Sequence, residues 1–160
     1  IVEENEIVDG SLIKPGDKVI GFESSGLHSN GYSLINDMLW RHKIFYKEMP
    51  ELLTPTVIYS PLIQRLMDEI PILGMAHITG GGIPGNISRC IPKGLKANVN
   101  YDSWPLPELF SKIQLAGEIP PEDMKTTFNC GIGFCIIVPP DVTIDSSIQS
   151  WEIGDVQTIN

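Results

Sequence analysis

The stretch ESSGLHSNGYSLIND, residues 23–37, surrounds one histidine with glycine, serine and asparagine directly before an amphipathic segment. Apolar residues recur at helical spacing over 34–39, so the sequence predicts a helix there, with Ser29 or Asn30 as its N-cap. The apolar run over 19–22 follows a Lys-Pro-Gly-Asp turn signal and predicts a strand that leads into the loop. The stretch therefore predicts a strand, a small-residue loop and a helix, a junction whose unpaired N–H groups suit an anion.

The rest of the chain alternates between short apolar runs and amphipathic segments. Ser60 is expected to cap a second helix that has Pro61 in its first turn, and Gly117 is expected to end a later helix. Predicted strands cover 72–78, 95–101, 133–138 and 151–156, and predicted helices cover 60–70, 84–91, 106–113 and 120–127. This order predicts an α+β (mixed α/β) domain with one mixed β-sheet flanked by helices in a layered sandwich.

The composition indicates one compact domain over residues 1–160. Hydrophobic residues make up 42% of the 160 residues and charged residues 19%, which suffices for one core. The 11 Lys and Arg residues are scattered among 20 Asp and Glu residues, and the formal net charge is −9. Because phosphate backbones are held by clustered basic side chains, this balance argues against broad nucleic-acid binding. A phosphorylated ligand would then be small and held by oriented backbone amides.

Cysteine usage and hydropathy point to the cytoplasm. The 3 cysteines have no CxxC spacing and indicate a reducing compartment. The acidic N-terminal segment has no signal-peptide features, and no apolar run approaches the roughly 18 residues of a membrane span. We therefore expect a cytoplasmic protein that has no membrane partner.

Three glycine-bearing loops are the candidate ligand contacts. They are SSGLHSNGY (residues 24–32), HITGGGIPGN (77–86) and FNCGIGF (128–134), and each adjoins a predicted strand. Glycine lets a backbone approach a ligand closely, so such loops suit phosphate or ribose contacts. The alternative is that each loop is a tight turn. None of them matches a P-loop or the dinucleotide-binding fingerprint.

His28 is the candidate catalytic residue. A histidine titrates near neutral pH, so His28 could polarise or deprotonate a substrate group; the alternative is a loop histidine that hydrogen-bonds the backbone. His77 is expected to be a packed residue at a strand end, and His42 a solvated residue at a helix end. The histidines and cysteines lack metal-ligand spacing, so no metal site is predicted.

The sequence is similar to one enzyme family over essentially its whole length. The segments KPGDKVIGFESSGLHSNGYSLI, TPTVIYSPLI, AHITGGGIPGNISRCIP, SWPLPELF and TFNCGIGFCIIVPP occur in the order and approximate spacing of phosphoribosylformylglycinamidine cyclo-ligase, also called aminoimidazole ribonucleotide (AIR) synthetase. The histidine-bearing loop and the FNxGIG loop together separate this family from selenophosphate synthetase, thiamine-phosphate kinase and hydrogenase-maturation proteins. The resemblance is to the C-terminal half of the family, because the DGVGTK-type and GGETAE-type motifs of the N-terminal half do not occur in this sequence.

This resemblance implies an ATP- and Mg²⁺-dependent ligase of de novo purine biosynthesis that converts formylglycinamidine ribonucleotide to aminoimidazole ribonucleotide. ATP phosphorylates the formamide oxygen, the amidine nitrogen attacks that carbon, and phosphate leaves. The N-terminal half is implied to bind ATP and Mg²⁺ and to form most of a homodimer interface. This chain would be the substrate-cleft domain, which requires no cofactor alone and is expected to be inactive by itself.

The same resemblance implies the site residues. His28 would be catalytic and would either orient the amidine or move a proton. The implied substrate-binding residues are Ser25, Gly26, Ser29, Asn30, Thr79, Gly80, Gly81, Gly82, Asn86, Asn129, Gly131 and Gly133. Gly85 departs from the family, which usually has an acidic residue at that position. Two alternatives remain open: an amidotransferase-type synthase of the same superfamily, and a non-catalytic ligand-binding or dimerisation module.

Overall fold

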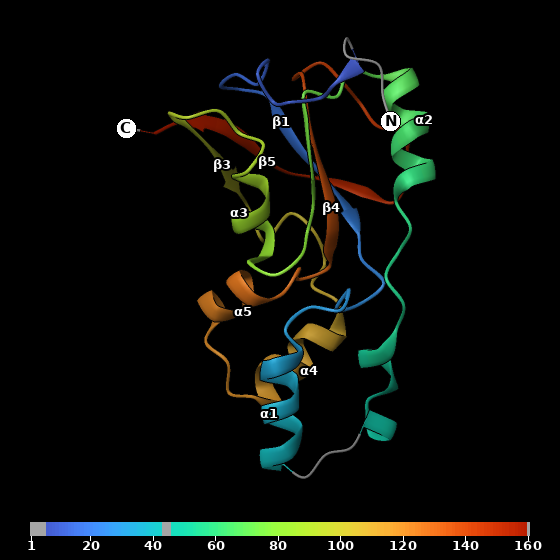
Figure 1. The fold of residues 1–160 in the computed structure, drawn as a ribbon, viewed down its shortest axis with the longest axis vertical. Helices are drawn as coiled ribbons and strands as arrows, with labels where there is room; N and C mark the ends of the chain where they lie inside the picture. The colour runs from blue at the N-terminus through green and yellow to red at the C-terminus, as the bar shows by residue number, and fades with distance from the viewer. Residues whose placement is uncertain (1–5, 43–45, 160) are drawn as a thin grey trace.

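The computed structural model describes residues 6–42 and 46–159, which form one five-stranded sheet with helices around it (Figure 1). The strands are β1 (Lys18–Glu23), β2 (Gly74–His77), β3 (Leu95–Val99), β4 (Ile132–Val138) and β5 (Ser150–Thr158). The helices are α1 (Tyr32–His42), α2 (Ser60–Glu69), α3 (Gly82–Ile87), α4 (Glu108–Ala116) and α5 (Pro121–Thr127), with 3-10 turns η2 (Tyr46–Glu48) and η3 (Pro50–Leu53). Each strand and helix predicted from the sequence is present, and the α+β class is confirmed.

The sheet is antiparallel at every described pairing, so the expectation of a mixed sheet was wrong in strand direction. The order is β2-β4-β1-β5-β3, and all four neighbouring pairs are antiparallel. The strands β1, β2 and β3 share one direction, as strand–helix–strand units suggest, but β4 lies between β1 and β2, and β5 between β1 and β3. The two late strands therefore separate the three early ones, which a local sequence pattern does not reveal.

Alternating side chains on the central strands divide the core between the two faces of the sheet. Along β4, Cys135 and Ile137 pack with Ile83 of α3 on one face. Phe134, Ile136 and Val138 point to the other face and pack in one cluster with Ile63 and Leu66 of α2. Successive strand residues point to opposite faces, so a continuous apolar run such as β4 must be covered on both. This arrangement is the predicted layering of helices around one sheet.

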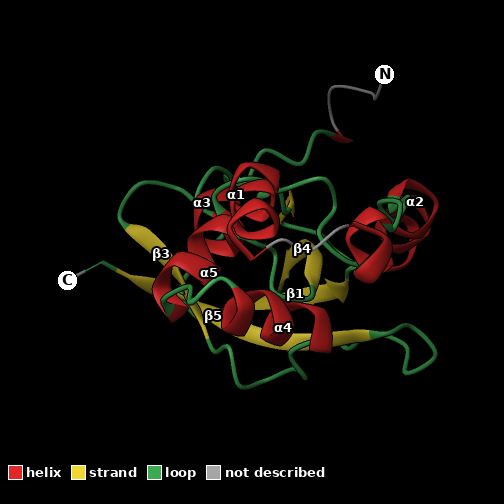
Figure 2. Ribbon diagram, turned by 90° about the horizontal axis from the view of Figure 1, so that it is seen from below, coloured by secondary structure: helices red, strands yellow, loops and turns green. Residues whose placement is uncertain are grey.

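A third apolar cluster lies beyond one end of the sheet. It joins α1, α4 and α5, which lie below the strands in Figure 1 and in front of them in Figure 2. Phe110 of α4 and Phe128 after α5 are fully buried there, with ring centroids 6.3 Å apart. Loop residue Leu27 belongs to the same cluster, so the loop after β1 is anchored in it. None of the described helices combines the length and apolarity that a membrane crossing requires.

The first helix starts later than predicted. α1 begins at Tyr32, and the carbonyl of Gly31 accepts the first helical hydrogen bond, from Ile35 N at 3.0 Å. Gly31 is therefore the N-cap in place of Ser29 or Asn30. The side-chain amide of Asn30 instead donates to the carbonyl of His28 at 2.7 Å, so it shapes the loop before the helix.

Two other helix boundaries also differ from the prediction. Ser60 is the first residue of α2, and the N-cap is Tyr59, whose carbonyl accepts the hydrogen bond from Ile63 N at 2.9 Å. α3 covers 82–87 where 84–91 was predicted, because the chain tightens into a turn after Ile87. In that turn Cys90 N donates to the Ile87 carbonyl, three residues back, at 3.2 Å.

Candidate functional site

Three loops meet at one end of the sheet. Loop 1 (residues 24–31) leaves β1, loop 2 (78–81) leaves β2, and loop 3 (128–131) enters β4. Because β4 lies between β1 and β2 and is antiparallel to both, its beginning lies beside their ends. Ser24 N donates to the Gly131 carbonyl at 2.8 Å, and Ile78 N donates to the Gly133 carbonyl at 2.9 Å. The fold thus brings together the three glycine-bearing loops that the sequence analysis selected.

Asn129 joins loop 3 to loop 1 from inside the protein. Its side chain has 0% exposure, and its Oδ1 accepts hydrogen bonds from Ser24 Oγ at 3.0 Å and Gly131 N at 2.9 Å. Its Nδ2 donates to the Gly26 carbonyl at 2.7 Å. The oxygen and the nitrogen of the side-chain amide are therefore both hydrogen-bonded within the chain, and Asn129 holds two loops together.

Asn86 plays the same part for loop 2. Its side chain is 3% exposed, and its Oδ1 accepts a hydrogen bond from Thr79 Oγ1 at 2.9 Å. Its Nδ2 donates to the carbonyls of Gly82 at 2.7 Å and Thr79 at 3.1 Å. The asparagine near the end of α3 thereby closes the triple-glycine turn that precedes the helix.

The groups that loops 1 and 2 leave open to a ligand are backbone amides and short polar side chains. Gly80 and Gly81 are exposed, and their N–H groups have no acceptor among the described residues. A Cβ built on Gly80 would lie 3.9 Å from Asn30 Oδ1, which places loop 1 against loop 2 at this point. Ser25 and Ser29 are exposed on loop 1. Unpaired N–H groups on exposed glycines are the donors that an oxyanion uses.

His28 is buried in loop 1, with 5% of its surface exposed. Its Nε2 accepts a hydrogen bond from Ser25 N at 3.0 Å and lies 3.4 Å from Val57 N. Burial, with a smaller contribution from nearby His77, lowers the pKa of its imidazole to about 4. His28 is therefore neutral at physiological pH. It is also one of four non-glycine residues with positive φ among those described, at φ 49°, a conformation that marks local strain.

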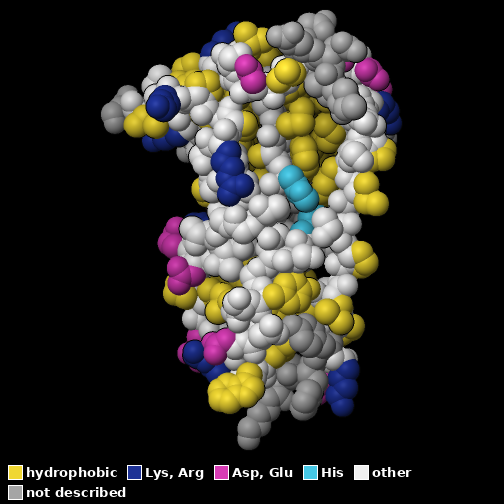
Figure 3. Space-filling model, viewed as in Figure 1, with side chains coloured by type: hydrophobic (Ala, Val, Ile, Leu, Met, Phe, Trp, Pro, Cys, Tyr) yellow, Lys and Arg dark blue, Asp and Glu magenta, His cyan; other side chains and the backbone are white. Residues whose placement is uncertain are grey.

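A cluster of aromatic rings that the sequence motifs did not predict surrounds His28. Tyr59 lies 5.9 Å from His28 between ring centroids, and its hydroxyl donates to the Glu23 carbonyl at 2.6 Å. His77 is exposed where a packed residue was expected, and its ring stacks on Phe134 at 6.1 Å. Figure 3 shows histidine side chains beside a hollow with an apolar floor, and His77, Phe134 and Tyr59 line a cavity of about 380 Å³ between β2 and α2. His42 is exposed at the end of α1, as predicted.

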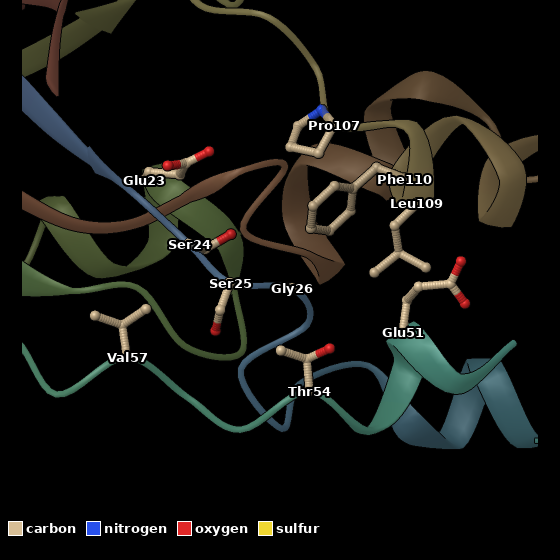
Figure 4. A pocket seen from close by; sticks show the side chains of 10 residues that line it. All are labelled: Glu23, Ser24, Ser25, Gly26, Glu51, Thr54, Val57, Pro107, Leu109 and Phe110. Atoms are coloured by element: carbon tan, nitrogen blue, oxygen red, sulfur yellow. The ribbon is translucent and has the colours of Figure 1, made fainter. Parts of the chain in front are cut away.

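A second cavity, of about 500 Å³, opens beside loop 1 (Figure 4). We call it the loop-1 pocket. Its lining comes from the end of β1, from loop 1, from the strap over residues 54–59, from η3 and from the region around the start of α4: Glu23, Ser24, Ser25, Gly26, Glu51, Thr54, Val57, Pro107, Leu109 and Phe110. Two carboxylates and three hydroxyls make the pocket a better partner for N–H and O–H donors than for a phosphate. The segments TPTVIYSPLI and SWPLPELF contain the strap and the start of α4, but only the fold shows that they lie beside loop 1.

Comparisons with known proteins identify the family. A family model described as AIR synthase related protein, C-terminal domain, matches residues 14–159. A phosphoribosylformylglycinamidine cyclo-ligase of Prochlorococcus marinus (strain MIT 9313) is 45% identical over 175 residues, which cover 99% of this chain and 51% of the relative. One of Parasynechococcus marenigrum (strain WH8102) is 44% identical over 174 residues, covering 98% and 50%. The chain thus spans about half the length of the curated relatives it matches.

The fold is similar to that of solved thiamine-monophosphate kinases. The enzyme of Aquifex aeolicus has a TM-score of 0.59 at 15% identity over 94% of this chain and 49% of the kinase. AaThiL complexed with AMPPCP and TMP gives 0.60 at 15%, over 91% and 46%. The kinase of Stenotrophomonas maltophilia K279a gives 0.61 at 16%, over 98% and 52%. At such low identity the likeness concerns the fold alone, whereas the family model matches residues 14–159 directly, and the chain therefore belongs to the AIR synthase related proteins as a C-terminal domain.

Proposed function

We propose that this chain is the C-terminal, substrate-cleft domain of a phosphoribosylformylglycinamidine cyclo-ligase. The complete enzyme would close the imidazole ring of formylglycinamidine ribonucleotide to give aminoimidazole ribonucleotide in cytoplasmic purine biosynthesis, acting as a homodimer. The identity of 45% to a relative with this name, over 99% of the chain, supports the proposal. The observation that carries it is the meeting of three glycine-bearing loops at one end of the sheet, where Gly80 and Gly81 offer unpaired N–H groups.

The proposed reaction divides the work between two domains. ATP supplies the phosphoryl group that turns the formamide oxygen into a leaving group, and the resemblance assigns ATP and Mg²⁺ to the N-terminal half. Among the described residues, no three His, Cys, Asp or Glu side chains lie together in a way that could hold a metal ion. The steps proposed for this domain therefore use its own backbone amides and side chains.

The two ends of the substrate differ in charge, and the two parts of the site differ to match. The substrate phosphate is an anion, so we place it at loop 2, where the amides of Gly80 and Gly81 are free. The amidine end is rich in N–H donors and accepts a proton readily. We place it in the loop-1 pocket, where Glu23 and Glu51 provide carboxylates and Ser25 a hydroxyl. Held at both ends, the substrate keeps its amidine nitrogen near the carbon that it attacks, which removes much of the entropy cost of ring closure.

Calorimetry on matched glycine variants tests this placement. Gly80 and Gly85 both accept a side chain, because a Cβ at Gly80 meets only Asn30 Oδ1, at 3.9 Å, and one at Gly85 meets nothing within 4 Å. We would titrate formylglycinamidine ribonucleotide into the 160-residue chain and its Gly80→Asp, Gly80→Ala and Gly85→Asp variants. A carboxylate at position 80 should weaken binding by about tenfold or more through repulsion of the phosphate, whereas the other two changes should alter it about twofold at most.

Equal effects of Gly80→Asp and Gly85→Asp would contradict the proposed phosphate position. If the wild-type chain bound no substrate, and the complete protein also formed no product, the chain would be a non-catalytic module of this family.

A further inference from the structure

The hydrogen-bond partners of His28 determine which of its ring nitrogens holds the proton. Ser25 N–H donates to Nε2 at 3.0 Å, and Val57 N–H lies 3.4 Å from the same atom. Ser25 Oγ is also close to Nε2, at 3.1 Å, but Oγ donates its proton to the Pro55 carbonyl at 2.6 Å. An imidazole nitrogen that accepts from a backbone N–H cannot carry a proton itself. The proton of neutral His28 is therefore on Nδ1.

The other side of the ring is enclosed. Nδ1 is buried and has no hydrogen-bond partner among the described residues. It faces the backbone of Gly133, where an added Cβ would lie 2.7 Å from Nδ1 and 2.5 Å from Cε1. The glycine at this position lets the ring pack directly on β4. A buried Nδ1 against backbone has no open route to a substrate atom.

The two N–H groups that meet His28 come from two walls of the loop-1 pocket, loop 1 and the strap. Ser25 belongs to loop 1 and Val57 to the strap, and both residues line that pocket. The bond from Ser25 Oγ to the Pro55 carbonyl joins the same two walls. His28 therefore lies behind the pocket and ties its walls together. Tyr59 packs against the ring at 5.9 Å and is itself fixed by its 2.6 Å bond to the Glu23 carbonyl.

We infer that His28 is a positioning residue, which accepts backbone hydrogen bonds through Nε2 as the Nδ1–H tautomer and holds the loop-1 pocket in shape, and that it does not move a proton during ring closure. Tyr59 and Gly133 fix the ring in this place. The catalytic consequence rests on the proposed function, but the tautomer does not. The resemblance left two roles open for His28: orienting the amidine or moving a proton. The inference excludes proton transfer, and the pocket walls that His28 joins orient the amidine.

Nitrogen NMR of the imidazoles tests the tautomer without any variant of His28. The chain has 3 histidines, so His42→Gln and His77→Gln assign the signals by elimination. We expect the Nε2 of His28 to resonate as an unprotonated nitrogen and Nδ1 as a protonated one from pH 8 down to about pH 5. His77, Tyr59 and Glu23 are the titratable neighbours, and repeating the series in His77→Gln shows whether charge on His77 sets the result. A proton on Nε2, or titration of His28 near neutral pH, would overturn the inference.

Conservative variants test the role itself. Glutamine places a carbonyl oxygen near the position of Nε2 and can accept the two N–H groups, but it cannot exchange a proton near neutral pH. In the complete protein, His28→Ala should lower kcat/KM by about 100-fold. His28→Gln should recover most of that loss, because glutamine can accept the same hydrogen bonds, and a residue that only positions the loops does not need to exchange a proton. His28→Gln as inactive as His28→Ala, with substrate binding retained, would overturn the inference. Inactivity of the wild-type protein would count against the proposed function only, because the nitrogen spectra decide the tautomer independently.

Discussion

At the scale of single residues, the site is built from buried polar side chains that satisfy backbone groups. Asn129, Asn86 and His28 each accept or donate two or more hydrogen bonds to loop backbone, and each is at most 5% exposed. Loop backbone N–H and C=O groups have no partners in a sheet or helix, so buried side chains supply their hydrogen bonds. Ser25, Ser29 and Asn30 remain the side chains of loop 1 that a ligand can reach.

Removing the Asn129 amide should destabilise the chain strongly. Asn129→Ala breaks three hydrogen bonds and leaves buried partners such as Gly131 N without an acceptor. We expect a loss of about 2–4 kcal/mol in the free energy of unfolding, measured by urea denaturation. Asn100 is exposed, and Asn100→Ala removes the one hydrogen bond that its Oδ1 accepts from Asp102 N. This variant serves as the control and should cost under about 1 kcal/mol. Equal losses for the two variants would show that the Asn129 amide does not hold the loops.

Burial of His28 should make stability depend on pH. Burial lowers the pKa of His28 from 6.5 to about 4, so between these values the unfolded chain binds a proton that the folded chain does not. The free energy of unfolding should therefore fall as the pH falls from 6.5 to about 4, by about 3 kcal/mol in total for this residue. Urea unfolding at a series of pH values should show this slope in the wild type and not in His28→Gln. The exposed carboxylates of Asp9 and Asp145, whose pKa values are lowered by hydrogen bonds from Ser11 and Ser147, act only below about pH 3.8.

A slope of the same size in His28→Gln would assign the pH dependence to other groups. His77→Gln is the second control, because His77 is exposed and its removal should leave most of the slope in place.

Only part of the site could be predicted from individual residues of the sequence. The loop around His28 follows from local composition. So does the alternative role of His28 as a histidine that hydrogen-bonds backbone, and the bond from Ser25 N agrees with that role. Tyr59 could not be found in this way, because it lies 31 positions along the chain and meets His28 only after the strap folds over β1. Which asparagines face a ligand and which face backbone also depends on burial, which residue type alone does not determine.

At the scale of elements, local sequence patterns determine the helices and strands but not their arrangement. The apolar runs of β1 and β4 and the periodicity of α2 were enough to predict those elements. The order β2-β4-β1-β5-β3 depends on pairings between segments far apart in the chain, such as Lys18 with Val138, for which the sequence carries no local signal. The convergence of loops 1, 2 and 3 follows from that order. The sequence could therefore predict which residues belong to the site, but not how these residues lie relative to one another.

The short helix α3 provides a matched pair of glycine variants. Gly85 lies within the helix and a Cβ there meets nothing within 4 Å, so Gly85→Ala should stabilise the chain by about 0.5–1 kcal/mol through helix propensity. Gly82 has φ 62°, and a Cβ there would collide with the Lys125 carbonyl, so Gly82→Ala should destabilise by several kcal/mol. Thermal unfolding of both variants checks the contrast. Stabilisation by Gly82→Ala would mean that α3 does not lie against α5, the helix that contains Lys125.

At the scale of the whole molecule, the site lies at the junction of two bodies. The sheet with α2 and α3 forms one, and the cluster of α1, α4 and α5 forms the other. The loop-1 pocket lies between them, with Ser25 on the sheet side and Leu109 and Phe110 on the helical side (Figure 4). The pocket is open, and the chain spans about half the length of its relatives, so we propose that the N-terminal domain completes the cleft.

The most direct test of the central proposal is product formation by the complete protein. We would measure ATP-dependent conversion of formylglycinamidine ribonucleotide to aminoimidazole ribonucleotide by the complete protein, by its Gly80→Asp and Gly85→Asp variants, and by the 160-residue chain alone. We expect activity in the complete protein, a loss of about tenfold or more in kcat/KM for Gly80→Asp only, and no turnover by the isolated chain. Turnover by the isolated chain would contradict the division of work between two domains, and a complete protein that binds no substrate and forms no product would contradict the cyclo-ligase function itself.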